Sequence, residues 1–178
     1  MSVYKKAYEM LEKYIPAHRL LKWGLNWSPM FRRTTGKIIY VSEDLHKVVV
    51  KIPISWRNRN YVGSIFGGSL FSATDPIGMM QVLQILGKNY VVWDKSSEIR
   101  FRKPAYDDVY AHFEISQLDI ERIKQAVKED GQTDFDLTVP ITDEDKEVLY
   151  CEVRKTIYIA DKAYYKAKRK ARQESKDD

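Results

Sequence analysis

One glycine-rich segment brings together residue types that could bind a developing negative charge. Asn60, Gly63 and the pair Gly67-Gly68 lie directly before an apolar stretch, and Asp75 follows the second glycine by seven positions. Unpaired backbone N–H groups at a helix start attract negative charge, and glycine lets a ligand approach the backbone closely. Such a turn can hold an oxyanion, while an ordinary loop-to-helix junction is also built with glycines.

Asp75 has two interpretations. Leu70 and Phe71 lie close to it in the sequence, and a carboxylate in apolar surroundings is costly unless it is capped, paired or used in a reaction. The run Thr74-Asp75-Pro76 is also typical of a helix start, with Asp as the N-cap and Pro as the first helical residue. The sequence therefore predicts either a capping carboxylate or a catalytic base that faces a cavity beside the glycine turn.

The elements that must position these residues follow from hydrophobic periodicity. Residues 67–88 are apolar almost all round, which predicts a central helix covered on most sides. Alternating stretches predict antiparallel hairpins, and hence an α+β fold rather than a parallel βαβ sheet. The expected strands are 37–41, 47–54, 98–102, 109–115, 134–141 and 148–159. The third and the fourth of these strands each have one apolar and one polar face. Further helices are expected over 3–15, 18–25 and 120–129, and Gly131 closes the last of them.

The composition limits the class of protein. The chain has 178 residues, 44% of them apolar and 31% charged, which is typical of one compact globular domain. One Cys and three His exclude a disulfide framework and leave no cluster for a metal. No signal peptide is visible, and polar residues interrupt the longest apolar region, so a cytoplasmic protein without a membrane span is expected.

The charge distribution favours an anionic partner. The formal net charge is +5, and most of the excess lies in residues 161–178. A solvated basic helix explains this tail better than nucleic-acid binding does, so nucleic acid is not an expected partner.

The spacing of the glycine-rich segment resembles that of the hotdog-fold acyl-CoA thioesterases of the phenylacetate-degradation type. In their motif an Asn is followed by Gly, Gly-Gly and an acidic residue, and Asn60, Gly63, Gly67, Gly68 and Asp75 match those positions. The resemblance covers residues 37–159 and includes the strand that closes in Arg-Phe-Arg-Lys-Pro. Most relatives have His directly before Gly-Gly, whereas this chain has Phe66, so any role of that imidazole is absent.

The resemblance implies a hotdog fold, a curved antiparallel sheet wrapped around the central helix, and a dimer whose sheets join edge to edge. It also implies that the backbone N–H groups of Gly67 or Gly68 bind the thioester carbonyl oxygen. Asp75, from the opposite subunit, would activate water or attack directly, and Asn60 would orient the substrate or the water. No metal and no separate cofactor are implied, because CoA is part of the substrate.

Four residues are expected to contact the substrate. Arg100, Arg102 and Lys103 would bind the CoA phosphates, for which a solvated strand face is the alternative. Phe66 would lie beside the thioester in place of the histidine. Cys151 lies between apolar strand residues and is expected to be a buried structural thiol rather than a nucleophile.

The chain is thus expected to comprise an N-terminal helical extension (1–30), a hotdog domain (31–160) and a basic helical tail (161–178). Its tryptophans, Trp23, Trp27, Trp56 and Trp93, are expected in the core rather than in an acyl pocket. The function implied by the resemblance is hydrolysis of an acyl-CoA thioester by a homodimer or a dimer of dimers. The alternative is a non-catalytic acyl-CoA binding or sensing protein.

Overall fold

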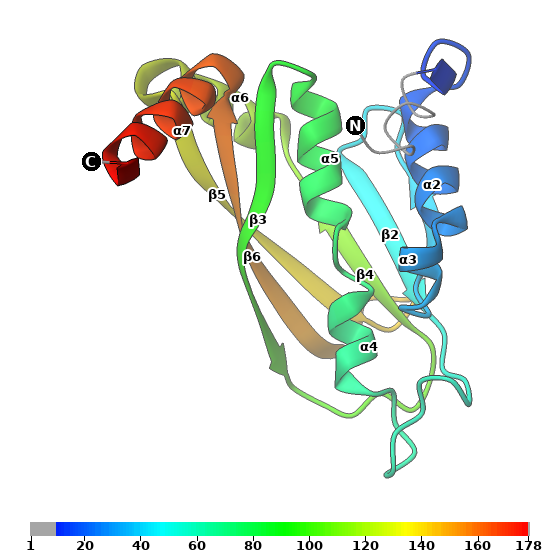
Figure 1. The fold of residues 1–178 in the computed structure, drawn as a ribbon. Helices are drawn as coiled ribbons and strands as arrows, with labels where there is room; N and C mark the ends of the chain where they lie inside the picture. Colours follow the sequence, from blue (N-terminus) through cyan, green and yellow to red (C-terminus); the bar gives the residue numbers. More distant parts are fainter. Residues whose placement is uncertain (1–9, 178) are drawn as a thin grey trace.

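Six antiparallel strands form one curved sheet in the order β1-β2-β4-β5-β6-β3 (Figure 1). The computed structural model describes residues 10–177, so the helix expected over residues 3–15 lies mainly outside the described residues. The strands are β1 (Lys37–Val41), β2 (Lys47–Ile52), β3 (Tyr90–Phe101), β4 (Val109–Glu114), β5 (Gln132–Thr142) and β6 (Leu149–Asp161). The helices are α2 (Ala17–Trp27), α3 (Pro29–Arg32), α4 (Gly67–Ser72), α5 (Ile77–Leu86), α6 (Gln117–Asp130) and α7 (Lys162–Asp177). The expected α+β architecture, a curved sheet with a helix inside it, is confirmed, and this is the hotdog fold.

The central helix is divided in two, so the prediction of one continuous helix over residues 67–88 is wrong. α4 ends at Ser72, and α5 begins at Ile77. Pro76 explains the break, because proline has no N–H to donate and disfavours a helical conformation in the residue before it. α5 lies against the concave face of the sheet, and a Cβ on Gly78 would come within 2.7 Å of Leu137. Its opposite side is half-exposed rather than covered.

Two strands differ from their expected form. β3 is twelve residues long and begins at Tyr90, well before the expected residue 98. β4 was expected to have a polar face, but Tyr110 and His112 on that face are both buried. The turn after β5 covers them: the Tyr110 hydroxyl lies 3.2 Å from Glu144, and His112 Nε2 lies 3.1 Å from the Thr142 hydroxyl.

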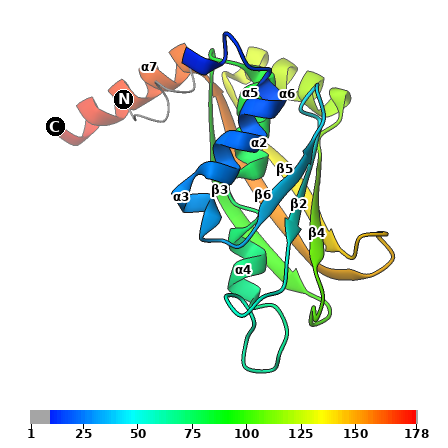
Figure 2. The same ribbon diagram turned by 90° about the vertical axis from the view of Figure 1, so that its right-hand side faces the viewer.

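α2 packs beside the edge strand β1 (Figure 2). Leu21 and Leu25 belong to the same buried cluster as the sheet residues. The Asn26 side chain donates to the carbonyl oxygen of Ile38 and accepts from its N–H, each at 2.9 Å. This pair of hydrogen bonds satisfies backbone groups that an edge strand otherwise leaves open.

The tryptophans lie outside the core, which corrects the prediction made from their type. The core consists mainly of Ile, Val and Leu, and all four tryptophans are exposed. Trp23 and Trp27 are four residues apart on the side of α2 that faces away from Leu21 and Leu25, because residues at that spacing share a helix face.

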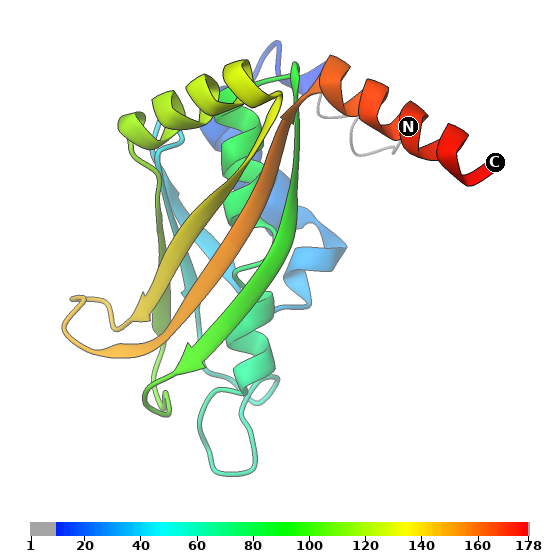
Figure 3. The same ribbon diagram turned by 90° about the vertical axis from the view of Figure 1, so that its left-hand side faces the viewer.

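α6 and α7 lie at the same end of the sheet (Figure 3). Ser116 and Asp119 form a capping box at the start of α6, and Gly131, at φ +75°, closes it as predicted. Tyr164 of α7 packs against Gly131, so closely that a Cβ there would come within 2.3 Å of the ring. Tyr165 and Lys168 of α7 also contact the sheet, and the C-terminal part of α7 projects away from it.

Candidate functional site

Gly67 and Gly68 form the first turn of α4. Phe66 is the N-cap residue, and its backbone N–H donates to Asn58 O at 2.7 Å. Among the described residues, the N–H groups of Gly67 and Gly68 donate to no protein acceptor. The Phe66 ring lies against Gly68 and the Phe101 ring against Gly67, so that a Cβ on either glycine would come within 2.8 Å of an aromatic carbon. The glycines therefore allow two exposed rings to lie directly on the backbone.

Asn60 belongs to the loop before this turn. Its side-chain oxygen accepts from the N–H groups of Val62 and Ser64, each at 3.1 Å, and its side-chain nitrogen donates to the Ser64 hydroxyl at 2.8 Å. These bonds fix the shape of the loop that leads to Phe66. A direct contact between Asn60 and a substrate stays a prediction.

Asp75 lies in the break between α4 and α5, and the structure contradicts the capping interpretation. The N-cap residue of α5 is Pro76, without a side-chain cap bond, so Asp75 is not the capping residue. The expectation of apolar surroundings is also wrong, because the Asp75 side chain is 65% exposed in the single chain.

A buried lysine holds this carboxylate. Lys155 of β6 is only 1% exposed, and its Nζ lies 3.1 Å from Asp75 Oδ1 and 2.9 Å from Asp94 Oδ2. Asp94 comes from β3, and its other oxygen is buried and has no hydrogen-bond partner in the described part of the chain. Burial raises the pKa of the Asp94 carboxyl above its ordinary value, against the opposite effect of the Lys155 ammonium. Two carboxylates therefore share one cation, and the cluster keeps an excess of negative charge when both are ionised.

The cations expected to bind phosphate lie at the end of β3. Arg100 is paired through Nε with Glu98 at 2.8 Å, and each side chain is about half exposed. Arg102 and Lys103 follow the strand, and their backbone N–H groups both donate to Tyr150 O. Both side chains are exposed. Since Phe101 contacts Gly67, the end of β3, which Arg102 and Lys103 follow, lies near the glycine turn, whereas the Arg100 side chain points to the opposite face of the strand.

The structure thus brings the predicted residues together in two groups. Phe66, the two glycines and the end of β3 form one, and Asp75 forms the other with Lys155 and Asp94. Gly67 begins α4 and Asp75 follows the end of α4 by three residues, so the six-residue helix, roughly 9 Å long, lies between the acid and the amides of one chain.

Sequence reasoning missed Lys155 and Asp94. Lys155 occupies the inward position between Val153 and Ile157 in an alternating strand, and a charge at such a position requires a partner. This interruption was a usable signal. Asp94 carried no comparable signal, because the first half of β3 was not recognised as a strand.

Cys151 is a buried structural thiol, as predicted. It is fully buried, and burial raises the pKa of its thiol to about 12. The thiolate form that a nucleophile requires is therefore disfavoured. Within residues 10–177 no cluster of three or more His, Cys, Asp or Glu side chains could hold a metal ion, and no described helix has the length and apolarity to cross a membrane.

Solved structures share this fold. A probable thioesterase from Pseudomonas aeruginosa, itself described as a protein of unknown function, superposes with a TM-score of 0.70 at 20% identity, covering 80% of this chain and 95% of that one. A thioesterase from Haemophilus influenzae gives 0.61 at 15% identity, covering 84% and 94%. A hypothetical thioesterase from Streptococcus pneumoniae, crystallised with coenzyme A, gives 0.51 at 21% identity, covering 71% and 86%.

At these identities the superpositions establish a common fold. No curated protein matches the sequence. A family model does match it over residues 17–159, a range that runs from the start of α2 almost to the end of β6. The chain therefore belongs to the family described as a domain of unknown function, DUF4442.

Proposed function

We propose that this protein hydrolyses acyl-CoA thioesters, with Asp75 as the general base or nucleophile. The observation that carries the proposal is the environment of Asp75. Its carboxylate is open to solvent and therefore reachable by a substrate, while one oxygen is held by a lysine that is 1% exposed. A reactive group must be accessible and also fixed in position, and this arrangement meets both requirements.

The N–H groups of Gly67 and Gly68 supply the second part of the proposed site. Negative charge develops on the carbonyl oxygen when a thioester is attacked, and a preorganised donor at that position typically lowers the barrier by about 3 to 4 kcal/mol. Both N–H groups lack a protein acceptor among the described residues, so they are available to an oxyanion. A thiolate is a good leaving group, and the proposed reaction needs no strong general acid.

The separation between Asp75 and the glycines favours a site shared by two copies of the chain. In the proposed dimer, Asp75 of one copy faces the glycine turn of the other. β3 supports this arrangement, because it lies at one edge of the sheet and most of its residues are exposed. An unpaired edge strand is a ready template for pairing with another strand.

CoA is the proposed carrier of the acyl group. Arg102 and Lys103 are exposed near the glycine turn, where they could bind its phosphates. Arg100 would have to exchange its bond to Glu98 for a phosphate. The bound coenzyme A of the Streptococcus pneumoniae structure, which has the same fold, supports this choice of ligand.

Thiol release from a panel of short, medium, long and aryl acyl-CoAs tests the proposal. We expect Asp75→Asn to lower turnover by roughly a hundredfold or more, because the general base is lost. Asp145→Asn, which changes an exposed carboxylate in the turn between β5 and β6, is the matched control and should leave turnover unchanged. Equal rates for wild type and Asp75→Asn would rule out the proposed role.

One observation favours binding without catalysis. The Phe66 ring lies directly on Gly68, on the backbone that the mechanism requires. A substrate that uses this backbone must displace the ring, and because the Phe66 side chain is 57% exposed the ring has room to move. A protein that gains thermal stability with acyl-CoA but releases no thiol, in wild type and in Phe66→Ala alike, would be a sensor rather than an enzyme.

A further inference from the structure

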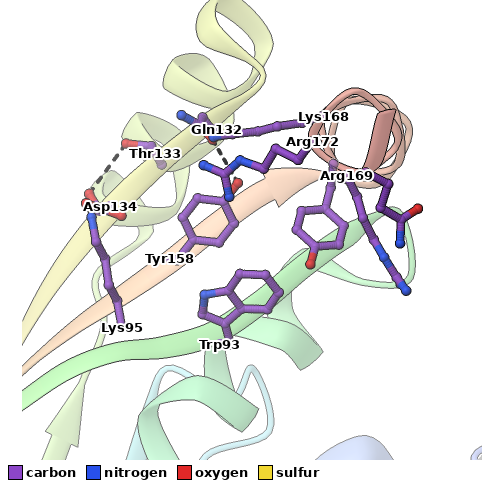
Figure 4. Close-up of a pocket in the computed structure, with 11 residues that line it drawn as sticks. Trp93, Lys95, Gln132, Thr133, Asp134, Tyr158, Lys168, Arg169 and Arg172 are labelled. Atoms are coloured by element: carbon purple, nitrogen blue, oxygen red, sulfur yellow. Dashed lines mark hydrogen bonds and ion pairs between the residues drawn. The ribbon is translucent and has the colours of Figure 1, made fainter. Parts of the chain in front are cut away.

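A groove separates α7 from the convex face of the sheet, on the side opposite to Asp75. It has a volume of about 790 Å³ and lies over β3, β6 and β5 (Figure 4). Trp93 and Tyr158 form its floor, and they are partners in the β3–β6 register. Their neighbours Asp94 and Ile157 point to the concave face, since successive strand residues alternate between the two faces. The groove is therefore separate from the proposed thioesterase site.

Three aromatic rings form one continuous surface in this groove. Trp93 stacks on Tyr158 with ring centroids 5.0 Å apart and planes at 19°. Tyr165 of α7 meets Trp93 edge-on, at 5.1 Å and 80°. Trp93 is nevertheless 40% exposed, so part of its ring remains open. A flat ligand ring can stack on such a platform whatever its identity.

Cations line the other side of the groove. Lys168, Arg169 and Arg172 line it from α7, at a spacing that places them on one helix face. Lys168 and Arg172 extend toward Gln132 and Tyr158, whereas Arg169 extends to the other side (Figure 4). Among the described residues of the lining, Asp134 is the only acidic side chain, and it is paired with Lys95. The described lining therefore has three more cationic than anionic side chains, which favours an anion.

Two hydrogen bonds to one side-chain oxygen fix the position of α7 relative to the sheet. The Tyr158 hydroxyl donates to Gln132 Oε1 at 2.8 Å, and Lys168 Nζ donates to the same oxygen. This shared acceptor joins α7 to the sheet. Arg169, in contrast, lies within ion-pair distance of no carboxylate among the described residues. It is the cation most directly available to a ligand.

We propose that the groove binds a nucleotide, that is, a flat heteroaromatic ring joined to phosphates. The ring stacks beside Trp93, and the phosphates lie against Arg169 and Arg172, whose guanidinium groups match phosphate geometry. The volume lies within the usual range for one small-molecule ligand. Free nucleotides and the nucleotide part of CoA share this chemistry. The inference goes beyond the proposed function, because it requires no hydrolysis.

Titration calorimetry on the full chain tests the site. The probes are ADP and ATP for the free nucleotides, CoA and dephospho-CoA for the carrier, and adenosine and pyrophosphate for the two halves. We expect a complete nucleotide to bind at least about tenfold more tightly than either half, since stacking and charge act together. ADP that binds as well as CoA identifies a free nucleotide as the ligand. CoA identifies the carrier only if it binds more tightly than ADP and the groove variants below remove that extra affinity, because CoA also binds at the proposed thioesterase site.

Variants on the two sides of α7 locate the binding. Trp93→Leu and Arg169→Ala should each weaken nucleotide binding, by roughly tenfold to a hundredfold for the lost stacking surface. Lys170→Ala is the matched control, because Lys170 pairs with Glu174 and does not line the groove. If the Trp93→Leu variant does not fold, the nucleotide affinity of Arg169→Ala alone tests the location of the site.

Three outcomes would overturn the inference. They are the absence of binding at millimolar nucleotide, unchanged affinity in both groove variants, and tighter binding of a single-stranded oligonucleotide than of the mononucleotide. Asp75→Asn should leave nucleotide binding intact. Loss of thiol release and loss of nucleotide binding therefore report on the two proposals separately.

Discussion

The two faces of strands β3 and β6 carry positive charge in contrasting ways. On the concave face, the buried Lys155 is shared by Asp75 and Asp94. On the convex face, the cations of α7 lie in an open groove beside aromatic rings, and Asp134, the one acidic residue in the described part of its lining, is paired with Lys95. A buried cation must be neutralised by the protein itself, whereas a cation at the surface can be left for a ligand.

The largest expected effect concerns the concave face. Lys155→Met should lower the free energy of unfolding by about 3 to 5 kcal/mol, because it leaves two neighbouring carboxylates without their shared cation. Urea denaturation measures this change. Arg169→Met on the convex face is the control and should stay within about 0.5 kcal/mol of wild type. Similar losses in both variants would remove the contrast between the faces.

A second substitution tests whether charge causes that loss. Adding Asp94→Asn to Lys155→Met removes one of the two uncompensated carboxylates, so we expect about 1 to 3 kcal/mol of stability to return. The measurement is again urea denaturation, with the single variants completing a double-mutant cycle. Strictly additive losses would show that Lys155 and Asp94 act independently.

The convex face should respond to added anions instead. Pyrophosphate at ten times its dissociation constant should stabilise the folded protein by about 1.4 kcal/mol. The expected signal is a rise in melting temperature that is lost in the Arg169→Ala, Arg172→Ala double variant. A rise of equal size in that variant would place the anion elsewhere on the molecule.

The smallest expected effect on stability tests whether water reaches the whole of the convex face. His112 points to that face from β4, and burial holds the pKa of its imidazole below the ordinary value of 6.5, with a smaller contribution from Lys146. Below pH 6.5 the unfolded chain therefore binds a proton that the folded chain does not, so stability should fall as the pH falls.

Unfolding free energies at pH 7.5 and 5.5 check this sign. His112→Gln should show a smaller loss between the two pH values than wild type does. An equal loss in both proteins would indicate that the imidazole is hydrated, and that the turn carrying Thr142 and Glu144 does not seal this part of the sheet.

Much of the fold could be predicted from periodicity, because regular alternation and helical spacing are local properties. The β1–β2 hairpin, α6 with its Gly131 cap, and the long β5–β6 pair were all expected. Pro76 is also a signal for a break in the central helix. Thr-Asp-Pro has the composition of a helix start, however, and the sequence therefore equally predicts that Asp75 caps a helix.

The site was less predictable because its partners are distant in sequence. Asp75 and Lys155 are eighty residues apart and meet only when α5 packs on β6. The same holds for the four tryptophans: their size suggested burial, but their positions were set by neighbouring core residues. Residue type alone does not determine which side of an element a side chain occupies.

The Asn26 side chain has a consequence for how copies of this chain could associate. It forms hydrogen bonds with both backbone groups of Ile38, so that β1 offers no continuous row of donors and acceptors to a strand of another copy. β3, at the far margin of the same sheet, has no such helix-borne amide among the described contacts. In the proposed dimer, which pairs through β3, β1 would form the outer margin of each copy, and the bonds from Asn26 to Ile38 disfavour further growth there into a filament.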